Sequence, residues 1–408
     1  MGASDRTLTS IEICAGAGGQ AIGLHQAGFR HLALVEIDQH AVATLRRNIA
    51  HRDGWQFERD YCDIINKDVN LFEPRAELVK PLKHLGRQLQ QGELDLLAGG
   101  VPCPPFSHAG KQLGKEDERD LFPRMLDLVD DLLPKAVMIE NVRGIKDEKF
   151  SEYREWVIAR LQGGKATDPI TGERKEYDGA GHAEDLSYEV CEWEILEASD
   201  FGVPQLRPRA ILVAIQKKYL ARRQFQWPTP GVEFLSVRDA LEETMAERYE
   251  PFIQQGGVAG TQAQKALDDW RDASGGIAPT LVGGSKKHGG ADLGPSRAKA
   301  AWRNLGVDAL GVANAPKDVE KKKSWERDLF RPDGPMLTVT QAAIIQGFPR
   351  EWDFEGDASE GKLPGKTAQY RQVGNAFPPP VAKAVGKAIA EVLLAVAPEG
   401  PEGRKAGR

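Results

Sequence analysis

Short apolar runs alternate with amphipathic segments along the first half of the chain. The runs that are typical of buried strands occupy residues 8–14, 32–35, 94–98, 136–139, 188–196 and 210–215. Between them, apolar residues recur three or four positions apart, as at Ala41, Leu45 and Ile49, which is the spacing of a helix with one buried face. Strands that alternate with helices predict an α/β fold with a mainly parallel sheet covered on both sides.

The pattern changes after Ile215. Residues 216–335 are rich in glycine, proline and charge and contain few periodic runs, so we expect a smaller second domain of irregular structure. Helical spacing returns in residues 336–395, most clearly from Val381, where Pro378–Pro380 precede an apolar stripe. The tail, residues 396–408, is mostly proline, glycine and charge, and we expect it to be disordered.

Composition narrows the class of protein. No stretch of about 18 apolar residues occurs, which excludes a membrane span, and the first ten residues lack the pattern of a secretory signal. Four cysteines without a C-x-x-C pair indicate thiols rather than disulfides, and hence a reducing, cytoplasmic location. The net charge of −6 argues against a purely electrostatic nucleic-acid binder, yet it leaves room for a local basic groove.

A glycine-rich turn joins the first strand to the first helix. Gly16, Gly18 and Gly19 would let a ligand approach the backbone at the helix N-terminus. Glu36 ends the next strand, where a carboxylate can accept hydrogen bonds from ribose hydroxyls. The turn therefore predicts an adenosine-bearing cofactor. Its spacing does not separate a nicotinamide dinucleotide from S-adenosylmethionine, and a tight turn without a ligand is the alternative.

Cys103 follows another strand, on the side of the sheet where ligands bind in such folds. Pro102 restricts the backbone just before it, and a thiolate held in one orientation is a strong nucleophile. A small buried hydrophobe is the ordinary interpretation of a lone cysteine. A cysteine hydrolase with His108 as its base is a weaker alternative, because nothing in the spacing brings the two side chains together.

Two further positions carry charge at strand ends. Glu140 follows the buried run 136–139, where burial can raise the pKa of a carboxyl so that it donates a proton near neutral pH. Gln205, Arg207 and Arg209 alternate, so an extended strand points all three to one face. Two guanidiniums in one cleft indicate an anionic or oxygen-rich partner. The alternative for Glu140 is a polar residue that merely caps the strand. The alternative for the two arginines is an exposed edge strand with basic residues.

Together these segments resemble the DNA (cytosine-5)-methyltransferase family. The matches, in the family's order, are Gly16-Ala17-Gly18-Gly19, Glu36, Pro102-Cys103 with Phe106-Ser107, Glu140-Asn141-Val142, Gln205-x-Arg207-x-Arg209, Gln346-Gly347-Phe348-Pro349 and Gln372-Val373-Gly374-Asn375. The ordered set is far more specific than any one match. It implies a Rossmann-like, S-adenosylmethionine-dependent methyltransferase fold with a smaller, irregular target-recognition domain.

The resemblance implies roles for four catalytic residues. Cys103 would attack carbon 6 of a cytosine that has been flipped out of the DNA stack, and carbon 5 would then take the methyl group. Glu140 would contact ring nitrogen 3 and the exocyclic amine. Arg209 would hold the carbonyl oxygen of the base, and Arg207 would support Cys103 and Glu140.

The resemblance also implies a cofactor site and no metal site. The cofactor-binding residues would be Cys14, Gly16, Gly18, Glu36, Asp63, Ile64, Pro102 and Asn375. Cys14 departs from the family, which usually has phenylalanine there, and Pro104 replaces a common glutamine. Thr340-Gln341 stands where the family more often has Arg-Glu.

The same resemblance assigns the domains and the partners. Residues 1–215 would be the catalytic, cofactor-binding domain, 216–335 the target-recognition domain, and 336–395 a C-terminal segment that returns to the catalytic domain. We expect a monomer that acts on double-stranded DNA and protects it from a cognate restriction endonuclease. The candidate DNA-binding residues are Lys286, Lys287, Arg297, Lys299 and Arg303; glycines 283–284 and 289–290 would let the backbone approach the grooves.

Three rival interpretations remain. A tRNA cytosine-5 methyltransferase would share the catalytic motifs but have a different recognition region. A nicotinamide-dependent oxidoreductase would explain Gly16-x-Gly18-x-x-Ala21, but not Pro102-Cys103 together with Gly374-Asn375. A non-catalytic DNA-binding protein on the same scaffold is disfavoured by the presence of Cys103 and Glu140.

Overall fold

A seven-stranded sheet forms the centre of the first part of the chain. The computed structural model describes residues 6–102, 120–231, 233–283, 291–314, 322–356 and 364–395. Cys103, Lys286, Lys287 and the expected disordered tail lie outside these residues. The strands run in the order β3-β2-β1-β4-β5-β9-β8. Their bounds are β1 Leu8–Ile13, β2 Phe29–Glu36, β3 Asp63–Asn66, β4 Leu96–Gly100, β5 Ala136–Val142, β8 Tyr188–Glu197 and β9 Pro208–Gln216.

The predicted mainly parallel sheet is confirmed. Strands β1 to β5 pair in parallel, whereas β9 pairs antiparallel with both β5 and β8. The carboxyl ends of the parallel strands therefore share one edge of the sheet. A separate hairpin pairs β6 (Gly164–Thr167) with β7 (Arg174–Tyr177).

Fifteen α-helices lie in the described part of the chain. Those in the first half are α1 Gly19–Gln26, α2 Gln39–His51, α3 Gln56–Tyr61, α4 Pro74–Glu77, α5 Val79–Leu85, α6 Phe122–Leu132, α7 Ser151–Gln162 and α8 Lys217–Leu220. The others are α9 Val237–Ile253, α10 Gly257–Ala273, α11 Ser296–Asn304, α12 Lys322–Leu329, α13 Val339–Ile345, α14 Lys366–Asn375 and α15 Pro379–Leu394. None of them combines the length and apolar character that crossing a membrane requires.

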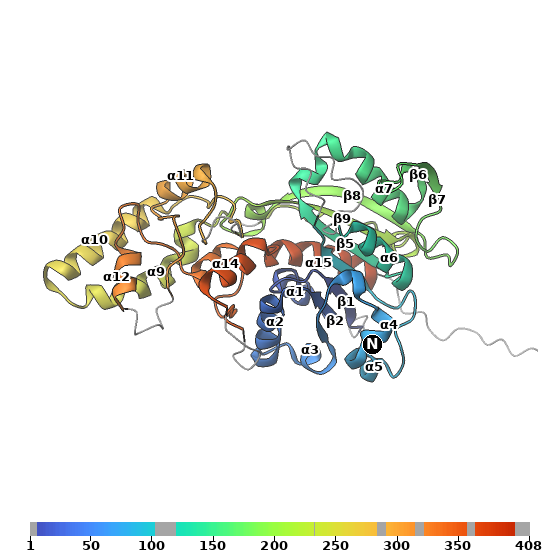
Figure 1. The fold of residues 1–408 in the computed structure, drawn as a ribbon, viewed down its shortest axis with the longest axis horizontal. Helices are drawn as coiled ribbons and strands as arrows, with labels where there is room; N and C mark the ends of the chain where they lie inside the picture. The colour runs from blue at the N-terminus through green and yellow to red at the C-terminus, as the bar shows by residue number, and fades with distance from the viewer. Residues whose placement is uncertain are drawn as a thin grey trace, which may run out of the picture.

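Helices cover both faces of the sheet. On one face, apolar residues of α6 and α7 pack with strand residues such as Ile13 and Ile139. On the other face, α1 and α15 pack with residues such as Ala98 and Met138. Helix α15 crosses the sheet beside α1 although the two are far apart in the chain, as Figure 1 shows. The last described helix is thus part of the same core as the first strand.

The segment after β9 is more regular than its sequence pattern predicts. Helices α9 and α10 have 17 residues each and lie with α11 and α12 at one end of the molecule, away from the sheet (Figure 1). In α9 the polar residues Thr244 and Arg248 occupy buried positions, which hides the helical spacing of apolar residues. Arg248 is satisfied there because it donates hydrogen bonds to the Met336 carbonyl and to Gln341 Oε1.

Candidate active site

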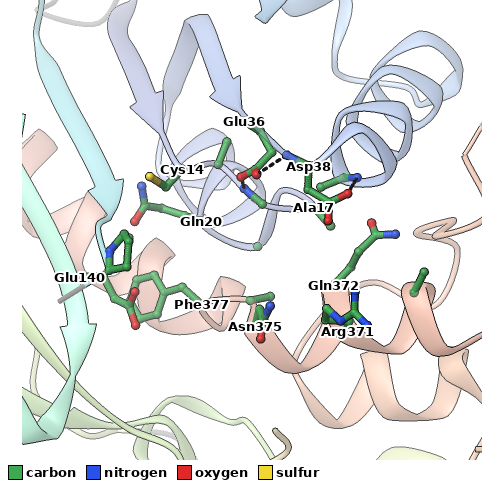
Figure 2. A pocket seen from close by; sticks show the side chains of 18 residues that line it. Cys14, Ala17, Gln20, Glu36, Asp38, Glu140, Arg371, Gln372, Asn375 and Phe377 are labelled. Carbon is green, nitrogen blue, oxygen red and sulfur yellow. Dashed lines mark hydrogen bonds between the residues drawn. The ribbon is translucent and has the colours of Figure 1, made fainter. Parts of the chain in front are cut away.

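A cavity opens at the carboxyl ends of β1, β2, β4 and β5. Its volume is about 320 Å³, which is within the range of small-molecule sites. The turn after β1, the ends of the other three strands and helix α14 form its walls (Figure 2). The lining residues are Cys14, Ala15, Gly16, Ala17, Gly19, Gln20, Glu36, Asp38, Ala41, Gly100, Pro102, Glu140, Ala368, Arg371, Gln372, Asn375, Ala376 and Phe377.

The turn after β1 takes an unusual backbone path. Gly16 has a φ of 54° and Gly18 a φ of 95°, and both values lie in the left-handed region that glycine adopts without strain. Cys14 also has a positive φ, of 52°. A Cβ atom on Gly18 would come within 2.9 Å of both Leu45 and Trp352. Gly18 therefore permits close packing behind the turn, whereas Cys14 and Gly16 face the cavity.

Glu36 fixes the turn from the neighbouring strand. Its Oε2 accepts a hydrogen bond from the Gly16 amide at 2.7 Å, and its Oε1 accepts one from the Asp38 amide at 2.8 Å. Burial raises the pKa of Glu36, and these two hydrogen bonds oppose that shift. Asp38 in turn caps α2 by accepting the His40 amide. Both carboxyl groups line the cavity, where they could accept hydrogen bonds from a ligand's hydroxyl groups (Figure 2).

Three expected cofactor residues do not line the cavity. Gly18 packs against Leu45 and Trp352 behind the turn. Asp63 and Ile64 begin β3 and are not among the residues that line the cavity. Asp63 Oδ2 accepts the Lys80 amide at 2.9 Å, and the Ile64 carbonyl accepts a hydrogen bond from Arg46. Pro102 and Asn375, by contrast, line the cavity.

Glu140 and Arg209 form an ion pair at the edge of the cavity. Because β5 and β9 are antiparallel, Glu140 pairs with Ile211, which places Arg209 two residues away on the same face. The Nε atom of Arg209 lies 2.7 Å from Glu140 Oε1, and the side chains are 12% and 13% exposed. Burial raises the pKa of Glu140, while the charges of Arg209 and Arg207 oppose the rise.

Arg207 makes its hydrogen bonds to backbone carbonyls, whereas the resemblance implies that it supports Cys103 and Glu140. Its guanidinium is buried and donates hydrogen bonds to the carbonyls of Leu281, Gly374 and Ala376, at 2.6, 2.8 and 3.0 Å. Burial lowers the pKa of Arg207 to about 9, and the nearby Arg209 adds to this. In the described residues Arg207 acts on Glu140 only through its charge. The extended strand begins at Pro208, so the guanidiniums of Arg207 and Arg209 are not confined to one face.

The candidate DNA-binding residues of α11 are mostly paired with acids. Lys299 Nζ lies 2.7 Å from Asp292, and Arg303 Nε lies 2.8 Å from Asp333. Arg297 is exposed and has no recorded partner among the described residues. Of the predicted basic group on this helix, Arg297 is the residue that presents an uncompensated charge.

A buried polar chain runs behind the cavity. Gln20 lines the cavity and donates a hydrogen bond from Nε2 to Glu12 Oε2 at 3.3 Å. Glu12 Oε1 lies 3.3 Å from His31 Nδ1, and Ser10 Oγ lies 2.8 Å from the same nitrogen. Burial raises the pKa of Glu12 to about 8 and lowers that of His31 to about 4. Both shifts favour the uncharged form of the side chain, so burial opposes an ion pair between Glu12 and His31.

Glu12 predicts a measurable pH dependence of stability. Because its pKa is higher in the folded protein than in the unfolded chain, its contribution to stability is complete at acid pH and is lost as pH rises through about 8. Between pH 6 and pH 8 the loss amounts to about 2 kcal/mol, since each pH unit corresponds to about 1.4 kcal/mol. We expect Glu12→Gln to remove this part of the decline, as measured by urea denaturation at both pH values. Parallel declines in the two proteins would contradict the assignment.

Several polar atoms in the cavity wall have no partner. Gln20 Oε1, Arg371 Nε and both amide atoms of Gln372 are buried without a hydrogen bond among the described residues. Since unpaired buried polar groups are costly, such atoms mark places where a bound molecule can donate or accept. A molecule with hydroxyl, ammonium and carboxylate groups, such as S-adenosylmethionine, fits this wall.

Sequence reasoning missed several of these lining residues. Helix α14 presents Ala368, Arg371, Gln372 and Asn375 to the cavity, at spacings of three and four residues. That helical spacing, started from the predicted Asn375, would have found Arg371 and Gln372. Nothing comparable marks Gln20, whose position depends on the close packing of α1 against the sheet.

Comparisons with known proteins agree with the arrangement. Residues 8–163 and 180–391 match the family model described as C-5 cytosine-specific DNA methylase. The type II methyltransferase M.NaeI of Lentzea aerocolonigenes is 44% identical over 389 residues, which cover 95% of this chain and 76% of that protein. M.NgoMIV of Neisseria gonorrhoeae, also a type II methyltransferase, is 39% identical over 394 residues, covering 95% of this chain and 98% of the relative.

Solved structures with the same fold are more distant in sequence. The Entamoeba histolytica methyltransferase EhMeth superposes with a TM-score of 0.54 at 13% identity, covering 95% of this chain and 99% of that one. The DNMT2 of Spodoptera frugiperda gives a TM-score of 0.51 at 15% identity, with the same coverage. At these identities the likeness concerns the fold.

Proposed function

The chain belongs to the family of C-5 cytosine-specific DNA methylases, and we propose that it methylates one cytosine within a specific double-stranded DNA sequence through a covalent cysteine adduct. As a member of this family it takes the methyl group from S-adenosylmethionine. One observation carries the proposal: the cavity that holds the glycine-rich turn and Glu36 also contains Glu140 and Pro102, the neighbour of Cys103 in the chain. The residues expected to hold the methyl donor and the target base therefore line one cavity.

The residues divide the reaction between them. S-adenosylmethionine supplies an electrophilic methyl group on a sulfonium, and Gly16, Glu36, Asp38 and Asn375 would hold it. The Cys103 thiolate adds to carbon 6 of the cytosine, which makes carbon 5 nucleophilic towards that methyl group. Carbon 5 would take the methyl group as its bond to the sulfonium breaks, which would release S-adenosylhomocysteine. A solvent base would then remove the proton from carbon 5, and the Cys103 sulfur would leave carbon 6 as a thiolate, restoring the double bond of the ring.

Glu140 and Arg209 would hold the base during this addition. Burial raises the pKa of Glu140, which would make it easier for this carboxyl group to pass a proton to ring nitrogen 3, where negative charge develops during the addition. Arg209, 2.7 Å from the same carboxyl group, would donate to the carbonyl oxygen of the base. The pair can act only on a cytosine outside the stack, so the reaction requires base flipping, at a cost of a few kcal/mol.

The region from 216 to 335 would provide sequence recognition. Arg297 supports this, because it is exposed on α11 without an acidic partner among the described residues. Its guanidinium would contact a phosphate and set the register of the protein on DNA. Lys299 and Arg303 would have to exchange their carboxylate partners for DNA.

We further propose that the chain acts within a restriction–modification pair. Two relatives that align over 95% of the chain are type II methyltransferases. The modification would protect host DNA from a cognate endonuclease, and the protein would act as a monomer. A gene neighbourhood without a nuclease would count against the first statement, and a stable dimer in sedimentation without DNA against the second.

The proposed reaction has a direct test. We expect tritiated S-adenosylmethionine to label unmethylated genomic DNA. Mass spectrometry should identify the labelled base as 5-methylcytosine, and sequencing should place it within one DNA sequence. Bulk tRNA serves as the alternative substrate and should remain unlabelled. Label in tRNA alone would keep the chemistry and reject DNA as the substrate. Label at every cytosine of the DNA would reject sequence-specific recognition.

A further inference from the structure

Two glycines meet where the recognition region crosses α14. A Cβ atom built on Gly374 would lie 2.5 Å from the amide nitrogen of Gly283 and 2.6 Å from its Cα. A Cβ atom built on Gly283 would lie 2.1 Å from Asn375 Oδ1. No side chain larger than hydrogen fits at either position without movement. The glycine that the sequence predicts to face DNA therefore lies against the wall of the cofactor cavity.

Hydrogen bonds hold the two backbone segments, at Gly283 and at Gly374, close together. The Leu281 amide donates to Gln205 Oε1 at 2.7 Å, and the Leu281 carbonyl accepts from Arg207. The same guanidinium of Arg207 holds the Gly374 carbonyl at 2.8 Å. The Leu206 amide also donates to the Ala278 carbonyl at 2.8 Å. The buried side chain of Arg207 is thus hydrogen-bonded to both segments, to Leu281 of the recognition region and to Gly374 of α14.

The side chain of Asn375 is the group that a larger residue at position 283 would displace. Asn375 ends α14, and its side chain reaches both the cofactor cavity and Gly283 (Figure 2 shows it on the cavity wall). After Asn375 Cγ at 2.9 Å, the next atom that a Cβ on Gly283 would meet is the Arg371 carbonyl, at 3.3 Å. A methyl group at 283 would therefore be relieved chiefly by rotating the Asn375 side chain.

We propose that Gly283 is a positioning residue for the cofactor cavity: by leaving the space that Asn375 occupies, it couples the placement of the recognition segment to cofactor affinity. The inference rests on the proposal that Asn375 contacts S-adenosylmethionine. Coupling between two sites is reciprocal in binding free energy, so a cofactor that holds Asn375 also restrains the segment at Gly283.

The matched substitutions are Gly283→Ala and Gly275→Ala. Neither glycine has a left-handed φ, and a Cβ on Gly275 has no atom within 4 Å, so alanine there should be harmless. We expect Gly283→Ala to bind S-adenosylhomocysteine about tenfold more weakly by calorimetry, as for a misplaced hydrogen-bonding group. The KM for S-adenosylmethionine should rise in parallel while kcat changes little. Gly275→Ala should bind as the wild type does, and both should unfold cooperatively at similar temperatures.

Asn375→Ala separates this mechanism from general damage. That variant removes the atoms that Gly283→Ala would meet, so adding Gly283→Ala to it should produce no further loss of affinity. Equal losses in the two backgrounds, or unchanged affinity in Gly283→Ala, would overturn the inference while leaving the proposed function intact. Failure of the wild type to bind S-adenosylhomocysteine would overturn both.

Discussion

Replacement of Cys103 by alanine is expected to abolish methyl transfer while leaving the cofactor site intact. Without the thiolate there is no addition at carbon 6, and carbon 5 of cytosine is then too weak a nucleophile to take the methyl group. We expect a loss of at least about 10⁴-fold in rate, the order seen when a covalent nucleophile is removed. The measurement is single-turnover transfer of tritium from S-adenosylmethionine to genomic DNA, with S-adenosylhomocysteine affinity measured alongside.

Cys191→Ala is the matched control for this experiment. Cys191 lies on β8 outside the cavity, and burial raises the pKa of its thiol to about 12, so it is not a thiolate at neutral pH. This variant should retain the wild-type rate. Residual transfer by Cys103→Ala within tenfold of the wild type would reject the covalent mechanism. A matching loss in Cys191→Ala would show that thiol removal damages the fold instead.

Replacement of Glu140 by glutamine is the second large effect that we expect. Glutamine preserves the size of the side chain but cannot offer an acidic proton to ring nitrogen 3, and it loses the ion pair with Arg209. Since charge on the ring is greatest in the transition state, the loss should fall mainly on kcat, by about 10²- to 10³-fold. Steady-state rates on genomic DNA, together with S-adenosylhomocysteine affinity, measure both quantities.

The control for Glu140 is an exposed carboxyl group on the same sheet. Glu189→Gln on β8 removes a charge outside the cavity and should leave both kcat and affinity unchanged. A Glu140→Gln enzyme with wild-type kcat and a raised KM for DNA would show that Glu140 helps to bind the base without stabilising the transition state. That result would contradict its assigned role.

Local patterns predicted the sheet well because buried parallel strands are continuous apolar runs. The expected strand at 136–139 is the first half of β5, and the one at 210–215 is most of β9. Strand β3 escaped prediction because its four residues are only partly buried at an edge of the sheet. Helix α9 escaped because Thr244 and Arg248 stand at buried positions, where tertiary hydrogen bonds replace apolar contact.

The sequence by itself determined the fold class, the family and the chemistry, because these depend on strand runs and on motifs that are local in the chain. Only the tertiary structure decided where the motif residues lie and what they contact. Arg207 reaches Leu281 and Gly374, which are 74 and 167 positions away. Gly283 similarly meets Asn375. The physical reason is that such contacts depend on how whole elements pack and cross, and hydrophobic spacing along one segment carries no information about a partner so distant in the chain.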